Sequence, residues 1–318
     1  MRKSFVALMA VALFAAMPVL AGPLMKNQVS TAANWVVHAD YEQFHKSRLG
    51  QLFRAELANL GIEEDLDNFA KVFSFHPLDD VRDVTIYGKG QDREKAVVLI
   101  EGRFDKEKVL ALVRLNPEHE ETEYGRIVVH KWRHEEKIPG RDAKEQMMYG
   151  CFYRDDLIVM SAGLPAVKHA IDVLKGSIPN ADSGRFDQIL VEKQGVFFLA
   201  AADDLGQTAG EQQKAAVLKQ AEQLALAIGQ DEKSVYIDVN LKADSQEAAQ
   251  YIQRILDGIL AYLALAGQEQ PKLAALVEKV NLSRVQDTVR IRFTSEPEPI
   301  LQFLKEQSKR RGQDKTKN

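Results

Sequence analysis

Apolar residues recur along this chain with two spacings, one typical of strands and the other typical of helices. The run Trp35–Asp40 predicts a short strand. Apolar residues three and four positions apart then predict a helix that stops at Gly61, and a shorter pattern of the same kind reaches about Phe73. We therefore expect one strand followed by two helices in this segment.

A series of strands with short connections comes next. Residues 81–87 and 96–102 predict two strands, and Gly88-Lys89-Gly90 between them is typical of a hairpin. The further elements predicted here are a helix capped by Asp105 that ends before Pro117, strands over 126–132, 147–153 and 157–161, and a helix from Pro165 to Gly176. Strands joined by such short turns indicate an antiparallel sheet, because parallel pairs need long crossovers.

The pattern then repeats in a weaker form. Residues 178–195 separate two halves, and the second half opens with a strand over 196–203 that ends in Ala-Asp, as the first strand does. Residues 90–97 also resemble 229–235. We predict an α+β fold with internal duplication, in which each of two related halves is an antiparallel sheet with helices packed on one face. A coincidence of strand and helix signals is the alternative.

The predicted division of the chain follows from this pattern. It gives a signal peptide over 1–21, a first α+β half over 22–180, a second α+β half over 181–304 and a basic disordered tail over 305–318.

Three strand segments resemble those of exported proteins of planctomycete-type bacteria. They are VRDVTIYG at 81–88, VVLIEGRFD at 97–105 and LIVMS at 157–161. The resemblance implies export and a duplicated α+β fold, and it implies no known activity.

The N-terminus has the layout of a secretory signal peptide. Arg2 and Lys3 precede an apolar stretch over 5–20, and cleavage is expected after Ala21. We therefore predict a periplasmic or extracellular protein, with an uncleaved membrane anchor as the alternative, although a span needs about 20 apolar residues. Export would place Cys151 in an oxidising compartment without a partner cysteine, and its neighbours predict a buried strand.

Composition excludes several classes of protein. With 45% apolar residues and a formal net charge of −4, the chain as a whole is not disordered, and 42 basic against 46 acidic residues leave no basic footprint for nucleic acid. Only the tail over 305–318 is strongly basic. It could contact an anionic lipid or wall polymer, or it could simply be solvated.

Candidate chemistry is sparse. Among seven histidines, His130 and His134 are closest in sequence, but on a strand they would lie about 13 Å apart, which one metal ion cannot bridge. Asp40 ends the first strand, near Tyr41 and His45, and Asp203 occupies the matching place in the second half. A hydrolase using Asp40 and Asp203 is one hypothesis, and ordinary helix caps are the simpler one. We assign no catalytic, cofactor-binding or metal-binding residue.

A long helix opening at Asp244 carries a second feature. Its polar face disappears over 259–266, which are apolar on all sides. We expect burial within the fold, and a contact with protein or lipid through residues 255–266 is the alternative. The predicted function is an exported non-catalytic cell-envelope protein, a ligand- or partner-binding or structural module of unknown specificity.

Overall fold

The computed structural model describes residues 24–136, 144–183, 193–205, 220–267 and 270–315, together with 186, 189 and 190. The predicted signal peptide lies outside these residues. The chain forms two compact units, here called unit 1 (Met1–Tyr41 and Asp65–Arg185) and unit 2 (Glu42–Glu64 and Phe186–Asn318).

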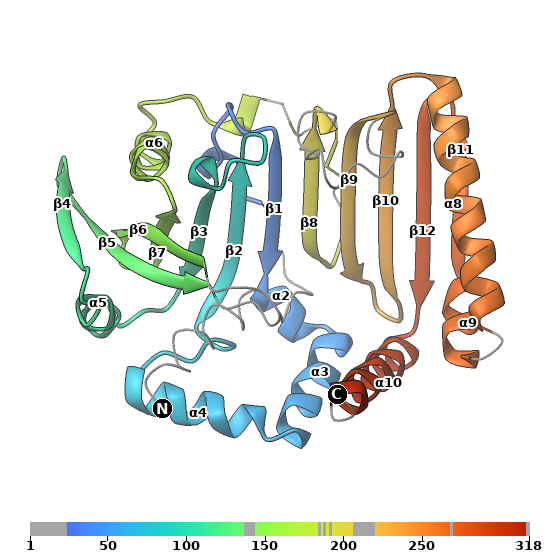
Figure 1. Ribbon diagram of the computed structural model, residues 1–318, viewed down its shortest axis with the longest axis horizontal. Helices are drawn as coiled ribbons and strands as arrows, with labels where there is room; N and C mark the ends of the chain where they lie inside the picture. The colour runs from blue at the N-terminus through green and yellow to red at the C-terminus, as the bar shows by residue number, and fades with distance from the viewer. Residues whose placement is uncertain are drawn as a thin grey trace. The chain divides into compact units, whose positions relative to one another are not determined.

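Unit 1 is built on antiparallel strands (Figure 1). Their order is β1 (Trp35–Asp40), β2 (Val81–Gly88), β3 (Val97–Gly102), β7 (Leu157–Ser161), β6 (Lys144–Arg154), β5 (Ile127–Glu136) and β4 (Glu120–Tyr124). Its helices are α4 (Ile62–Phe73, beginning in unit 2), α5 (Lys106–Arg114), α6 (Leu164–Leu174) and the short η1 (Lys26–Gln28), η2 (Arg93–Lys95) and η3 (Ala181–Ser183).

An apolar core around Phe69 and the carboxylate of Glu101 lie on opposite faces of this sheet. On one face, Phe69 of α4 and Phe75 pack against Val84 and Ile100 in an apolar core. Side chains alternate between the faces along a strand, so the neighbouring positions Asp83 and Glu101 lie on the other face. Helix η1 lies on this second face, since its Gln28 side chain bonds to Glu101. The carboxylates Asp83 and Glu101 therefore lie on the face opposite this core, where apolar side chains are buried as well, such as Leu99, which is two positions from Glu101 and 1% exposed.

Unit 2 is also antiparallel (Figure 1). Its strand order is β11 (Val280–Val285), β12 (Thr288–Ser295), β10 (Val235–Ala243), β9 (Ala221–Gln230) and β8 (Val196–Asp203). Its helices are α2 (Tyr41–Lys46), α3 (Arg48–Asn59), α8 (Gln246–Ala266), α9 (Pro271–Val277) and α10 (Pro297–Lys315). Helix α8 contacts β10, β11, β12 and α9, whereas α3 contacts α10.

The predicted mixture of helices and antiparallel strands is confirmed. The duplication into two related halves stays a prediction. The sequence pattern predicted that residues 42–64 belong to the first half, 22–180. In the structure they belong to unit 2, together with Phe186–Asn318.

Several predicted helix ends are present, and one differs. Asp105 caps α5 by accepting a hydrogen bond from the Lys108 amide at 3.2 Å, and Gly61 ends α3 with a φ of 74°. Helix α8, however, is capped by Ser245, whose hydroxyl accepts from the Ala248 amide at 3.1 Å. The cap is thus one residue later than Asp244.

The tail also differs from expectation. Instead of being disordered from residue 305, the chain stays helical in α10 as far as Lys315. The segment is rich in Lys, Arg and Gln and lacks proline, so most of its residues favour a helix. Ion pairs of Lys305 with Glu56 of α3 and of Glu306 with Lys272 of α9 hold the middle of α10 against the rest of unit 2.

Candidate functional site

Three carboxylates from neighbouring strands form a row on the face of the unit 1 sheet where helix η1 lies. Asp40 of β1 lies opposite Asp83 of β2, and Asp83 lies opposite Glu101 of β3. Residues opposite each other in antiparallel strands place their side chains on the same face, with Cβ atoms about 5 Å apart. Asp40 and Glu101 are each only 6% exposed. The sheet register therefore concentrates negative charge in a buried place.

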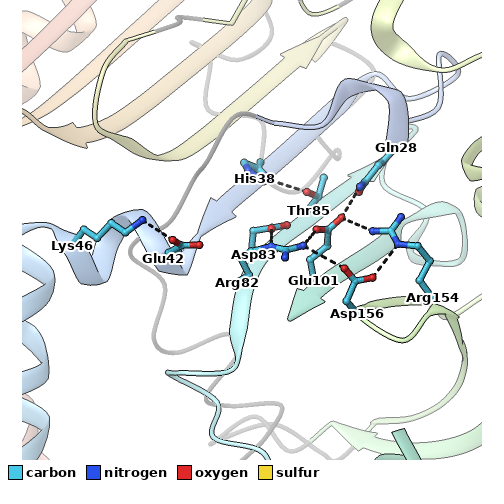
Figure 2. A network of polar contacts seen from close by, with 10 residues as sticks. All are labelled: Gln28, His38, Glu42, Lys46, Arg82, Asp83, Thr85, Glu101, Arg154 and Asp156. Atoms are coloured by element: carbon cyan, nitrogen blue, oxygen red, sulfur yellow. Dashed lines mark hydrogen bonds and ion pairs between the residues drawn. The ribbon is translucent and has the colours of Figure 1, made fainter. Parts of the chain in front are cut away.

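Two arginines and an amide offset this charge (Figure 2). Glu101 accepts a hydrogen bond from Gln28 Nε2 at 2.6 Å, forms a close ion pair with Arg82 and lies 3.4 Å from Arg154 Nη2. Arg154 Nε also donates to Asp156 at 2.9 Å. A buried carboxylate needs such partners, because an unpaired charge in the interior is costly.

An irregularity in β2 makes this pairing possible. The register between β2 and β3 shifts between Val81 and Asp83, which leaves Arg82 without an opposite residue in β3. A bulge of this kind redirects the side chain of the extra residue. Arg82 Nε lies 3.5 Å from Asp83, and its terminal nitrogen reaches Glu101.

The carboxyl group of Asp83 responds most strongly to these surroundings. Burial, followed by the charge of Glu101, raises the pKa of Asp83 to about 6, and Arg82 acts in the opposite direction. The Asp83 side chain is 20% exposed. The row can therefore hold a proton in mildly acidic solution.

The polar row continues along the strands. His38 lies opposite Thr85, and the His38 Nδ1 and Thr85 Oγ1 atoms are 2.7 Å apart (Figure 2). Both side chains are buried. This pair binds β1 to β2 through side chains as well as through the backbone.

The two aspartates of the hydrolase hypothesis belong to different units. Asp40 is in the carboxylate row of unit 1, whereas Asp203 ends β8 in unit 2, where its Oδ1 accepts a hydrogen bond from Gln223 Nε2 at 3.3 Å. His45, the third residue of that hypothesis, lines a shallow pocket of unit 2. The pocket has a volume of about 320 Å³ and is lined by His45, Gly50, Gln51, Arg54, Ala55 and Glu63. Neither aspartate lines it.

The apolar end of α8 is exposed, contrary to the expected burial. The helix is anchored through the buried Ala249 and Ile252 in its first half. From residue 258 to 266 no side chain is fully buried. The large apolar residues that face solvent on α8 are Tyr251 (44% exposed), Ile259 (48%), Tyr262 (70%) and Leu265 (64%).

These four side chains share one side of α8. They are eight, three and three positions apart, which at 3.6 residues per turn gives one stripe. We call Tyr251, Ile259, Tyr262 and Leu265 the α8 stripe. The apolar sequence over 259–266 favours burial, but within the described residues Ile259, Tyr262 and Leu265 are exposed to solvent.

Within the described part of the chain, no helix is both long and apolar enough to cross a membrane.

Cys151 is buried in β6, as predicted. Burial raises the pKa of its thiol to about 12.

Comparisons with known proteins add little to this geometry. No protein-family model and no curated protein match the chain. The solved structure of TP0453 in crystal form III is similar with a TM-score of 0.49 at 9% identity, over 90% of this chain and 97% of that one. Crystal form I of TP0453 gives a TM-score of 0.48 at 10% identity, over 88% and 96%. At this identity and TM-score, the similarity does not establish a function for this chain.

The carboxylate row was missed by the sequence reasoning. Asp83 and Glu101 lie inside segments that were correctly predicted as strands. A charged residue within an apolar strand is a sequence feature that could have indicated a buried polar site. Their adjacency depends on the register of β2 against β3, which includes the bulge at Arg82. Strand periodicity does not reveal that register.

Proposed function

We propose that this protein is an exported, non-catalytic protein of the cell envelope that binds a protein partner through the α8 stripe. The observation that carries the proposal is the exposure of four large apolar side chains on one side of α8. Single exposed apolar residues are common, but Ile259, Tyr262 and Leu265 follow one another three positions apart, and an exposed apolar group of this kind is typical of an interaction surface.

The chemistry of the stripe suits a protein partner. Tyrosine is enriched in protein interfaces, and Tyr251 and Tyr262 supply two of its four members. Full burial of a large apolar side chain is worth about 1.5–3 kcal/mol. The four side chains are already partly covered, so each contributes a fraction of this value, and the partner must add further contacts to offset the cost of association.

Charge on α8 favours protein over lipid. Helices that lie in a membrane surface carry Lys and Arg along their polar face. The charged residues of α8 are Glu247, Arg254 and Asp257, one basic against two acidic. An anionic membrane would gain little from this helix. A contact of the tail over 305–318 with an anionic surface is a separate expectation.

Export is supported by the sequence of residues 1–21, with a periplasmic or extracellular destination. The non-catalytic role is part of the proposal, and the pairing of Arg82 and Arg154 with Glu101 is consistent with a structural role for that carboxylate. The exported planctomycete-type proteins that the chain resembles have the same expected location.

A photo-crosslinking residue placed at position 262 tests the proposal in the intact envelope. We expect a protein adduct of one discrete mass, which weakens at least tenfold when Ile259→Ser and Leu265→Ser are added. The matched control places the crosslinker at Leu115, which is 78% exposed in unit 1. No adduct at 262, or one equally abundant at 115, would overturn the proposal.

Flotation with phosphatidylglycerol vesicles tests whether the α8 stripe binds lipid instead of a protein partner. We expect the purified full chain to bind vesicles equally with and without Tyr262→Ser. Vesicle binding that this substitution abolishes would assign the stripe to lipid instead. Tyr262 is 70% exposed, so its replacement leaves the fold intact.

A further inference from the structure

The hairpin of β4 and β5 brings together two histidines and a glutamate, residue types that often bind metal ions. Glu121 of β4 lies directly opposite His130 of β5. His119 immediately precedes β4, and residues two apart on an extended chain point to the same side. The hairpin thus places two imidazoles and a carboxylate together at the edge of the unit 1 sheet.

The separations between the three groups match those between ligands of one ion. His119 Nε2 lies 3.0 Å from His130 Nδ1, and Glu121 Oε1 lies 3.4 Å from His130 Nδ1 and 3.8 Å from His119 Nε2. A triangle with these sides has a circumscribed radius of about 2.0 Å, which is the length of Zn–N and Zn–O bonds. One ion can therefore lie within bonding distance of all three atoms once the two rings turn their lone pairs toward it.

We propose that His119, Glu121 and His130 form a binding site for one zinc-type divalent metal ion. Two imidazoles and one carboxylate are a ligand set that zinc uses, with a fourth position left for water. The exposure of the three side chains suits this: His130 is 6% exposed and His119 14%, whereas Glu121 is 42% exposed. Solvent reaches the site from the side of Glu121.

A direct hydrogen bond between the histidines is the competing explanation of the short distance. The ring planes lie 21° apart with centroids 5.3 Å apart, and the facing nitrogens are 3.0 Å apart, so one nitrogen can donate to the other. That bond needs a proton on one of the two facing nitrogens. A metal ion would replace this proton and use both lone pairs.

Two positively charged side chains, Arg114 and Lys106, lie near the three groups, and their charge opposes the binding of a metal cation. Arg114 Nε donates to Glu121 Oε1 at 3.1 Å. Burial lowers the pKa of His130, and the charges of His119, Arg114 and Lys106 lower it further. Glu121 acts in the opposite direction. A carboxylate has about four lone-pair positions, so Glu121 can keep Arg114 and still bind a metal ion. The guanidinium then orients the ligand, as supporting groups do in metal sites.

Titration of the full chain with Zn²⁺ by calorimetry, and with Co²⁺ by visible absorption, tests the site. We expect one equivalent to bind, with the Co²⁺ spectrum of a tetrahedral or five-coordinate nitrogen–oxygen site. His119→Ala and Glu121→Gln should each weaken binding at least tenfold. His134→Ala is the matched control on the same strand, and we expect it to leave binding unchanged.

The variants also guard against loss of folding. Trp132 emission identifies any variant in which the hairpin is disrupted, and Glu121→Gln keeps the size of the side chain. Absence of one-equivalent binding to the wild-type chain would overturn the proposal, and so would wild-type affinity in His119→Ala. Metal binding and the partner contact of α8 are independent, and neither result decides the other.

Discussion

Replacing Asp83 by asparagine should stabilise unit 1 at neutral pH. Asp83 shares the buried row with Asp40 and Glu101, and its pKa is raised from 3.8 to about 6. Between about pH 4 and 6, therefore, Asp83 is largely protonated in the folded protein and largely ionised in the unfolded chain. Its free energy of unfolding falls as the pH rises from about 4 to about 6, and this contribution is constant above that range.

The size of the effect follows from the shift. One unit of pKa corresponds to 1.36 kcal/mol, so ionisation of Asp83 costs the folded state about 3 kcal/mol at pH 7. Asparagine has a similar shape and no charge to bury. We expect Asp83→Asn to unfold with a free energy about 3 kcal/mol higher than wild type above pH 6, and nearly equal to it below pH 4.

Urea unfolding followed by tryptophan emission measures this difference. Both tryptophans of the chain, Trp35 and Trp132, lie in strands of unit 1, so their emission reports on that unit. Unfolding curves of wild type and variant from pH 3.5 to pH 8 give the difference at each pH by linear extrapolation. Asp155→Asn is the control, because this side chain is 92% exposed.

Two outcomes would refute the reasoning. A difference that does not change with pH would show that Asp83 titrates alike in both states. A variant less stable than wild type at pH 7 would show that attraction to Arg82, 3.5 Å away, outweighs burial and the repulsion of Glu101.

Two further predictions concern a helix cap and the lone cysteine. Ser245→Ala should destabilise α8 by about 1 kcal/mol and speed hydrogen exchange at the Ala248 amide, whereas Asp244→Ala should not, because Ser245 is the residue that caps the helix; a larger effect at Asp244 would contradict this. The thiol of Cys151, 3% exposed and with its pKa raised to about 12, should react with a disulfide reagent at pH 8 only after unfolding, and rapid labelling of the native protein would contradict its burial.

Sequence alone determined the elements whose signals are local. The strand Trp35–Asp40, the cap at Asp105 and the helix stop at Gly61 follow from periodicity, short-range hydrogen bonding and the backbone freedom of glycine. The short turns between strands likewise predicted antiparallel pairing, since the chain cannot connect parallel neighbours over so few residues.

Only the tertiary structure decided which of these elements meet and which faces they leave open. Asp83 meets Glu101, and Glu121 meets His130, through strand registers that depend on the whole sheet and on the bulge at Arg82. The exposure of Tyr262 depends on which side of α8 the other elements of unit 2 cover. Apolar periodicity shows that a helix face favours burial, but whether anything covers that face is a non-local property, because the covering residues come from distant parts of the chain or from another molecule.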